Sequence, residues 1–417
     1  MEEQLGKREV WKVNLYTLWF TQVLVNMGFG LAVPFIPYYL EEMAEMTNAQ
    51  LNLYTGLSST LPSAAMALAS PFWGYISDIY GRKMMLIRAM ICGAVILALM
   101  GVADTVLIFL ILRTLQGIFT GTIPASMALV SAHTPEDKMS YALGFMTSSN
   151  FLGYAMGPVI GSLVCGLFGY EVCFYVGGVL LAIGIFFVVF LVKEDAGTYG
   201  AALRQARLEA KQAAKERGGS SHMRLLTTNV LMTLTALLIL RIGRTLFSPF
   251  IAVFVRDSLG TMDGATTYTG IINMAMCVAT AVSSVTLTRL GDTYNKFKLA
   301  IILSIISFFV SALLPINYPL WVFTIMYALY YFVVGAIEPV LTSALSEETE
   351  PGQRGALFGM TGAVSSLGMM ISPMVGATVS TAFSTRVILA VIPIFMLAQV
   401  IFLVIERKVQ RRKQNAV

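Results

Sequence analysis

Long apolar stretches dominate this chain of 417 residues and constrain its fold more than any other feature. A helix needs about 20 consecutive apolar residues to cross the hydrocarbon core of a bilayer. Hydrophobic residues make up 57% of the sequence. They gather into stretches of roughly spanning length at 13–39, 54–73, 85–103, 106–128, 142–165, 172–192, 226–252, 267–288, 299–315, 320–345, 356–380 and 387–405. The sequence therefore predicts an all-α integral membrane protein with twelve transmembrane helices.

Charged residues are too scarce for a soluble enzyme of this length. They form 12% of the chain, against about 25% in soluble domains, so they could not cover a water-facing surface. The same composition excludes disordered, collagen-like and coiled-coil chains. The first apolar run leads directly into further spans, which favours a membrane helix over a cleavable signal peptide.

The sequence patterns of metal sites and catalytic nucleophiles are missing. The four cysteines (Cys92, Cys165, Cys173 and Cys277) show no metal-ligand spacing and predict no disulfide framework. Neither a P-loop nor a nucleophile elbow occurs. The net charge of +5 comes from basic residues in the connectors. We expect no metal, no cofactor, no enzymatic activity and no nucleic-acid partner.

The distribution of Lys and Arg predicts the orientation of the chain. Of 28 basic residues, three are plainly intramembrane, namely Arg113, Arg241 and Arg244, which leaves 28 − 3 = 25. With a cytoplasmic N-terminus, only Arg256 and Arg386 of these 25 fall outside. Because basic residues collect in cytoplasmic loops, we expect a multi-pass protein of the cell membrane with both termini in the cytoplasm.

One polar connector divides the chain into two halves. Residues 193–224 carry many helix-forming and basic residues and then Gly-Gly-Ser-Ser at 218–221. Two interpretations stay open: a helical cytoplasmic linker along the membrane surface with a regulatory role, or a solvated tether whose charges set topology. Either way, the predicted domains are one six-helix bundle over 1–192 and another over 225–417.

The two halves are internal repeats. Landmarks recur at separations of 214 or 215 residues: Asp78 with Asp292, Gly121 with Gly335, Pro34-Phe-Ile with Pro249-Phe-Ile, Gly157-Pro158 with Ser372-Pro373, and Gly161 with Gly376. Two six-helix bundles of the same orientation, related by a pseudo-two-fold axis, are typical of transporters that work by alternating access.

Four short motifs combine glycine, proline and charge at fixed spacings. They are Gly74-x-x-x-Asp78-x-x-Gly81-Arg82-Lys83 in a loop, Arg113-x-x-Gln116-Gly117, Gly153-x-x-x-Gly157-Pro158-x-x-Gly161, and Gly28 followed by Pro34-Phe-Ile-Pro37. Glycines four residues apart form a smooth stripe on which another helix can pack or slide. A proline within a helix removes one backbone hydrogen bond and permits a bend.

Together these motifs resemble those of the major facilitator superfamily, and in particular of its twelve-helix drug:proton antiporters. The resemblance implies a cytoplasmic gate formed by Gly74, Asp78, Gly81, Arg82 and Lys83, with Asp78 facing the start of the eleventh helix near Gly355. It also implies a moving seam formed by Gly153, Gly157, Pro158 and Gly161. In the second copy of the loop, Asp292 and Lys296 persist, but Thr288 and Asn295 replace glycines.

Charged residues inside the spans are the best candidates for function, because a charge at the bilayer centre is costly. Glu338 is the only carboxylate that we expect deep in a span, and it is the candidate proton carrier, coupled to Arg113 through its field. In the tenth span, Tyr327, Tyr331 and Glu338 are spaced by 4 and 7 residues and lie near one face, where the tyrosines are a substrate wall or packing residues. We expect Glu338 to lie roughly 9 Å in depth from Arg241, so that a bridge needs extended side chains, and farther from Arg244.

Amides supply the remaining candidate substrate contacts. Gln22 and Asn26 are four residues apart and share a helix face, and Asn150 lies in the fifth span. Asn150 could equally serve a helix–helix contact.

We therefore expect a monomeric transporter that exports small amphipathic organic molecules in exchange for protons. Three intramembrane arginines against one glutamate favour anionic or zwitterionic substrates. A proton-coupled importer of a small organic anion on the same fold is the alternative. A membrane-embedded enzyme or a receptor is disfavoured, because the sequence offers neither a convergent catalytic set nor an extra domain.

Overall fold

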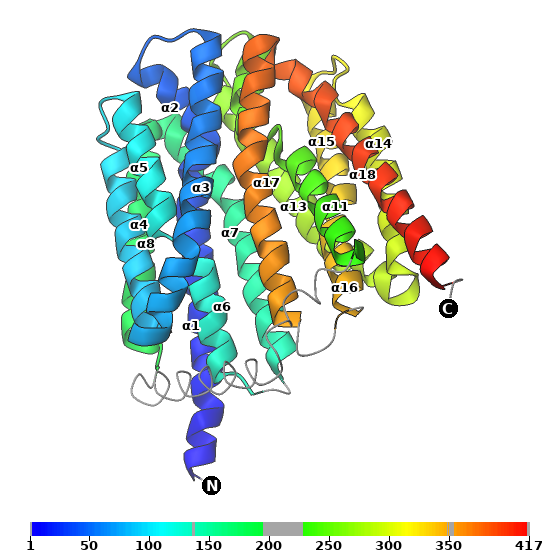
Figure 1. Cartoon of the computed structure of the whole chain (residues 1–417). Coiled ribbons are helices and arrows are strands. Elements are labelled where there is room, and N and C mark those ends of the chain that lie inside the picture. Colours follow the sequence, from blue (N-terminus) through cyan, green and yellow to red (C-terminus); the bar gives the residue numbers. More distant parts are fainter. Residues whose placement is uncertain (1, 136–137, 195–227, 348, 350–353, 415–417) are drawn as a thin grey trace. The chain divides into compact units, whose positions relative to one another are not determined.

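The computed structural model describes residues 2–135, 138–194, 228–347, 349 and 354–414 (Figure 1). These residues are helical without any strand, and they contain 11 helical segments that are long and apolar enough to cross a membrane. One more long helix, α3 (Asn48–Tyr80), has 33 residues and completes the twelve. The prediction of an all-α membrane fold is confirmed. The expected linker at 193–224 lies almost wholly outside the described residues.

Helices are the natural form for these segments, because backbone groups in lipid must be satisfied within the segment itself. The first half of the chain contains α1 (Glu2–Ala32), η1 (Val33–Phe35), α2 (Ile36–Met43), α3, α4 (Arg82–Met100), α5 (Val106–Phe119), α6 (Thr122–His133), α7 (Met139–Phe168) and α8 (Tyr170–Leu191). The second half contains α11 (Thr228–Thr245), η3 (Ser248–Phe250), α12 (Ile251–Leu259), α13 (Ala265–Thr293), α14 (Lys296–Leu313), α15 (Leu320–Val334), α16 (Ile337–Glu347), α17 (Arg354–Ala382) and α18 (Thr385–Gln414).

Contacts divide the chain into two compact units. The first consists of Met1–Glu45 and Ala64–Ala213, and the second of Met46–Ser63 and Ala214–Val417. The first half of α3 belongs to the second unit, because Gly56 lies against Ala377 and Arg256 donates a hydrogen bond to Asn48. In the first unit α1 packs on α7 and α8, and in the second α11 packs on α17 and α18.

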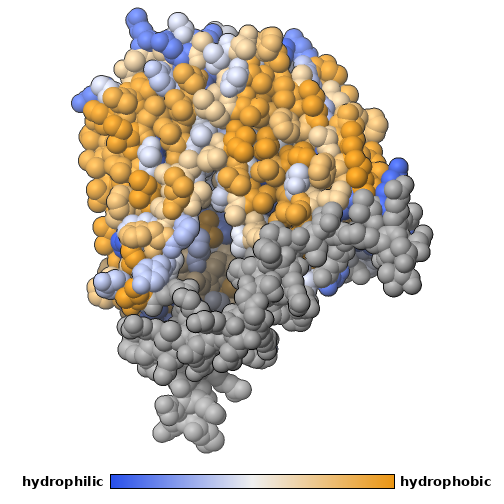
Figure 2. Space-filling model, viewed as in Figure 1, coloured by the Kyte–Doolittle hydropathy of each residue, from blue (hydrophilic) through white to orange (hydrophobic). Residues whose placement is uncertain are grey.

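The outer surface of both units is apolar. Figure 2 shows hydrophobic residues over most of the described part of one face. Large side chains such as Leu68, Phe186 and Trp321 are exposed. An apolar surface of this extent would drive association in water, whereas it suits contact with lipid chains.

The internal repeat is visible in the local backbone. After α1 and after α11, the chain makes one 3-10 turn and then a short second helix, at the two copies of Pro-Phe-Ile. Phe35 and Phe250, which precede the second helices, have nearly the same backbone angles, with φ of −103° and −99° and ψ of 3° in both. A proline in the first turn explains the break, since it cannot donate to the preceding helix.

The fourth and tenth predicted spans are each broken at their repeat glycine. Gly121 adopts a φ of +148°, which L residues rarely adopt, and separates α5 from α6. Gly335 separates α15 from α16. The predicted tenth span is confirmed as one spanning segment, Leu320–Glu347, and the turn at Gly335 divides it into α15 and α16.

The sequence indicated no disulfide framework, but the described residues contain one disulfide. Cys165 and Cys173 form a disulfide, with their Cα atoms 6.1 Å apart. Cys165 lies near the end of α7 and Cys173 in the first turn of α8, and the chain turns between them at Gly169, whose φ is +91°. This tight turn brings two buried thiols together, which a spacing of eight residues did not indicate.

Candidate functional site

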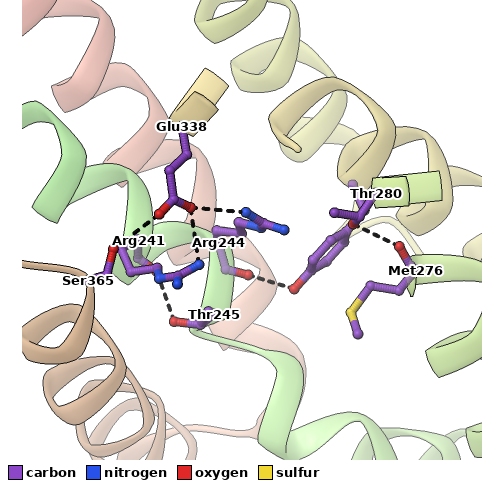
Figure 3. Close-up of polar contacts among 8 residues, drawn as sticks. Arg241, Arg244, Thr245, Met276, Thr280, Glu338 and Ser365 are labelled. Atoms are coloured by element: carbon purple, nitrogen blue, oxygen red, sulfur yellow. Dashed lines mark hydrogen bonds and ion pairs between the residues drawn. The ribbon is translucent and has the colours of Figure 1, made fainter. Parts of the chain in front are cut away.

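The second unit contains a carboxylate held by two arginines (Figure 3). Glu338 Oε2 lies 3.2 Å from Arg241 Nη1 and 3.3 Å from Arg244 Nη1. Its other oxygen accepts a hydrogen bond of 3.1 Å from the Ser365 hydroxyl. The cluster thus joins α11, α16 and α17. It carries a net charge of +1 with Glu338 ionised and +2 with Glu338 protonated.

Helix breaks position this cluster. Glu338 lies in the first turn of α16 and Arg244 in the last turn of α11. The partial positive charge at a helix N-terminus stabilises the carboxylate, and the partial negative charge at a C-terminus stabilises the guanidinium. The expectation that Arg244 lies farther from Glu338 than Arg241 is wrong, since the two distances nearly agree. The depth expected from the sequence did not include the turn at Gly335, which separates α15 from α16.

The charged groups are only partly exposed. The exposed fraction of the side chain is 27% for Glu338, 22% for Arg241 and 14% for Arg244. The Arg241 stem lies against Gly368 of α17, where an added Cβ would be 2.6 Å from Arg241 Cγ. A glycine at this position makes room for the arginine. The three charged side chains are therefore closely packed but partly exposed.

The two candidate tyrosines, Tyr327 and Tyr331, are buried. Tyr331 donates a hydrogen bond of 2.7 Å to the Arg244 carbonyl, and its ring lies 5.8 Å from the Arg244 guanidinium. Tyr327 is fully buried and stacks on Phe323. Tyr331 thus braces the end of α11, and Tyr327 forms part of an aromatic core.

A separate polar cluster lies in the first unit. Gln22 donates to Asn26 at 3.2 Å, which confirms that these residues share a face of α1, and Asn26 donates to Asn150 of α7 at 2.7 Å. Gln22 accepts a hydrogen bond from Ser126 of α6 at 3.1 Å. Gln22 and Asn26 are buried, and Asn150 is half-buried.

Arg113 is buried in α5 and donates to Gln116 at 2.5 Å. These are the charged and amide residues of the Arg113-x-x-Gln116-Gly117 motif, and they contact each other one turn apart. The expected coupling of Arg113 to Glu338 stays a prediction.

The glycine stripe of the fifth span packs on α1 within the first unit. A Cβ added to Gly157 would lie 2.8 Å from the Gly30 backbone, and one added to Gly153 would lie 2.6 Å from the Asn26 side chain. Gly161 meets the backbone of Leu31 even more closely. The stripe therefore allows two helices to touch along their backbones, with Pro158 inside α7. The sliding expected of this seam stays a prediction.

The loop motif joins two helix ends by reciprocal caps. Glu194 accepts hydrogen bonds from the backbone amides of Arg82 (3.0 Å) and Lys83 (2.7 Å), and so caps the start of α4. Lys83 Nζ donates to the carbonyls of Val189 (2.9 Å) and Val192 (2.6 Å), and so caps the end of α8. Each side chain satisfies backbone groups that a helix end leaves unpaired and carries the charge that this end favours.

Arg82 and Gly81 of the loop motif also have defined roles at the start of α4. Arg82 also donates to the carbonyl of Ala128 in α6. Gly81 adopts a φ of +94° before α4, whereas Asn295 at the matching position has a φ of −60° and caps α14 with its own side chain. This difference explains why the second copy needs no glycine there. The expected contact between Asp78 and the region of Gly355 involves side chains outside the described residues.

The sequence did not predict that Glu406 is buried. Glu406 of α18 has no exposed surface and accepts a hydrogen bond from Thr233 of α11. Glu406 is therefore a second buried carboxylate besides the partly exposed Glu338. Glu406 lies in the last, basic turns of the final span, where its neighbours Arg407 and Lys408 suggested a cytoplasmic edge. Burial there depends on which face of α18 packs on α11.

Sequence comparison now identifies the family. The model of the major facilitator superfamily matches residues 18–260 and 233–417. The chain belongs to this superfamily. Its members are transporters, and the chain is accordingly a multi-pass membrane transporter of small molecules and not an enzyme.

Among the relatives is the Lactococcus lactis homologue of the multidrug resistance efflux pump PmrA, 29% identical over 409 residues, which are 97% of each chain. The multidrug resistance protein MdtG of Proteus mirabilis is 28% identical over 91% of this chain and 92% of its own.

Solved structures share the fold at low sequence identity. The nucleoside transporter NupG superposes with a TM-score of 0.73 at 14% identity, over 95% of this chain and 99% of its own. A bacterial homologue of the human lysosomal transporter Spinster, in an inward-facing and occupied conformation, also gives 0.73 at 14% identity, over 94% of both chains. At this identity the likeness extends to the fold alone.

Proposed function

We propose that the chain is a proton-coupled exporter of small amphipathic organic molecules, acting as a monomer in the cell membrane with both termini in the cytoplasm. The observation that carries this proposal is the Glu338 carboxylate, shared by Arg241 and Arg244. The names of the relatives, which are multidrug efflux and resistance proteins, support the direction and the substrate class.

Protonation of Glu338 would release both arginines at once. With the carboxylate ionised, each guanidinium is paired with Glu338 through its Nη1, and α11 is held to α16. With the carboxylate neutral, two unpaired positive charges remain side by side, which is unfavourable in a partly buried site. A proton would therefore shift the balance between two arrangements of these helices, which is what coupling to transport requires.

The cluster also sets which substrates fit proton exchange. A basic or hydrogen-donating group that binds the Glu338 carboxylate competes with the proton for that carboxylate. An acidic group that binds only the arginines binds more tightly when Glu338 is protonated, because the carboxylate then no longer pairs with them. The coupling between substrate and proton is reciprocal. A substrate that competes with the proton therefore favours exchange, and a substrate that binds better to the protonated site favours cotransport. A zwitterion satisfies the exporter proposal, since its basic group competes at Glu338 while its acidic group contacts an arginine. A purely anionic substrate favours the alternative, a proton-coupled importer.

We propose Gln22, Asn26 and Asn150 as neutral hydrogen-bonding contacts for substrate in the first unit. They can accept and donate, so they suit varied polar groups without demanding one charge. We propose the loop of Asp78, Arg82 and Lys83 as the cytoplasmic gate and the stripe around Gly157 and Pro158 as a bending seam. The reciprocal caps between α4 and α8 support the first role, because they make the loop a rigid joint.

Flux in proteoliposomes tests the direction and the charge preference together. The probes are xanthene dyes that share one ring system but are cationic (a rhodamine ester), zwitterionic (rhodamine B) or anionic (fluorescein). With an acidic lumen, exchange for protons accumulates the zwitterion inside the vesicles. Accumulation only with an alkaline lumen would establish cotransport and the importer alternative. A strong preference for the cationic ester would contradict the role of the arginines.

A further inference from the structure

A cavity of about 290 Å³ lies within the first unit, between α3, α4, α5 and α6. It is separate from the cluster around Glu338, which belongs to the second unit. Its walls include the loop residues Gly74, Ser77 and Arg82, so the cavity lies near the ends of α3 and α4. A helix end of this kind is where the lipid head groups meet the protein.

Arg88 is the unusual residue of this cavity. Its guanidinium carbon lies 3.4 Å from the centroid of the Trp73 ring. Its Nε and Nη1 atoms are buried and have no hydrogen-bond partner among the described residues. A buried donor without a partner costs about 1–3 kcal/mol, and more when it is charged. Arg88 is therefore a cation with two buried N–H groups that have no acceptor among the described residues.

Trp73 makes this arrangement rigid. Its indole nitrogen donates a hydrogen bond of 2.7 Å to the Ile118 carbonyl of α5, which fixes the ring. Stacking on a fixed aromatic ring restrains the plane of the guanidinium, and Arg88 lines the cavity.

The remaining lining favours an anion with an apolar neighbour. Among the described residues of the wall, Arg82 is a second cation, and there is no carboxylate. Ser77 and Thr120 contribute hydroxyl groups, and the rest of the wall is mostly small and apolar. A Cβ added to Gly74 would meet nothing within 4 Å, so there is free space beside it.

We propose that this cavity binds a phosphate ester, with Arg88 as its main partner and Arg82 as a second cation. Guanidinium groups match the spacing of phosphate oxygens and bind them through paired hydrogen bonds. The ester could be part of a lipid head group or a soluble phosphate, since the chemistry at Arg88 is the same. The apolar wall beside the two cations accommodates the carbon chain that an ester carries.

Native mass spectrometry of the purified full-length protein tests this proposal with three probes: phosphatidylglycerol, glycerol phosphate and oleate. We expect Arg88→Gln to weaken phosphatidylglycerol binding about tenfold or more, since a charge-assisted contact is lost. Arg88→Lys should weaken it less. Lys298→Gln, which removes an exposed cation from α14, is the matched control and should bind as the wild type does.

The outcomes separate the sources of the ester. Binding of phosphatidylglycerol alone, dependent on Arg88, supports a lipid head group, and binding of glycerol phosphate as well supports a soluble ester. Equal binding of oleate would overturn the preference for phosphate, and binding unchanged by Arg88→Gln would overturn the proposal itself. Ala125→Leu keeps both arginines and fills part of the cavity, so it should weaken phosphatidylglycerol binding as well. Unchanged binding in that variant would equally overturn the proposal.

Discussion

Replacement of Glu338 by glutamine is the most informative perturbation of the proposed mechanism. Glutamine has the shape of glutamate but only one acceptor oxygen, so it can still accept from the arginines while its amide donates to the Ser365 hydroxyl. It removes the charge that both arginines share at 3.2 and 3.3 Å. It also removes the only group of this cluster that we propose to carry a proton.

The energetic cost follows from the distances and the exposure. One pair of unit charges at about 3.2 Å is worth roughly 5 kcal/mol at an effective dielectric constant of about 20. Fully exposed pairs contribute only about 0–1 kcal/mol. Since Glu338 is 27% exposed, we expect the variant to lose about 2–4 kcal/mol of stability, because two neighbouring guanidiniums remain partly unpaired.

The effect on transport should be larger and more specific. In proteoliposomes with a pH difference of about one unit, exchange of one proton per neutral dye molecule yields about tenfold accumulation. In Glu338→Gln we expect no accumulation, while exchange of labelled for unlabelled dye without a pH gradient continues. Ser365→Ala removes one hydrogen bond of 3.1 Å and no charge, so it should keep the full gradient-driven accumulation. About tenfold accumulation in Glu338→Gln would refute the role of this carboxylate.

Three further predictions concern the frame around the site. Gly157→Ala should destabilise the protein by about 1–3 kcal/mol, because the added Cβ would lie 2.8 Å from the Gly30 backbone. Gly166→Ala, where an added Cβ meets nothing within 4 Å, should leave the stability unchanged. Thermal unfolding of both variants in the same detergent compares them, and equal stability would contradict the close packing at Gly157. Tyr331→Phe should cost about 1–2 kcal/mol in the same assay through loss of its 2.7 Å hydrogen bond, and no loss would contradict the bracing role. Glu194→Ala should speed amide hydrogen exchange at the start of α4 about fivefold or more, and unchanged exchange would rule out the cap.

Much of the candidate site was visible in the sequence because charge inside an apolar stretch is rare. Arg241, Arg244 and Glu338 stand out for that reason alone, and they do meet in the structure. The hydrogen bond between Gln22 and Asn26 follows from the spacing of one helical turn. These inferences concern neighbours within a helix or the cost of a charge in lipid, and neither depends on how helices pack.

Partners across helices could not be predicted in the same way. The near-equal distances from Glu338 to the two arginines depend on how α11 and α16 pack against each other. The burial of Glu406, the disulfide between Cys165 and Cys173, and the stacking of Arg88 on Trp73 depend on which faces of neighbouring helices meet.

The sequence by itself determined the membrane-spanning helices, the repeat and the family, because hydropathy, spacing and motif are properties of order along the chain. Only the tertiary structure decided which charges touch, which stay buried without an acceptor and where helices break within a span. The reason is physical: a contact between helices depends on rotation and depth, and a shift of one residue turns a helix face by about 100°.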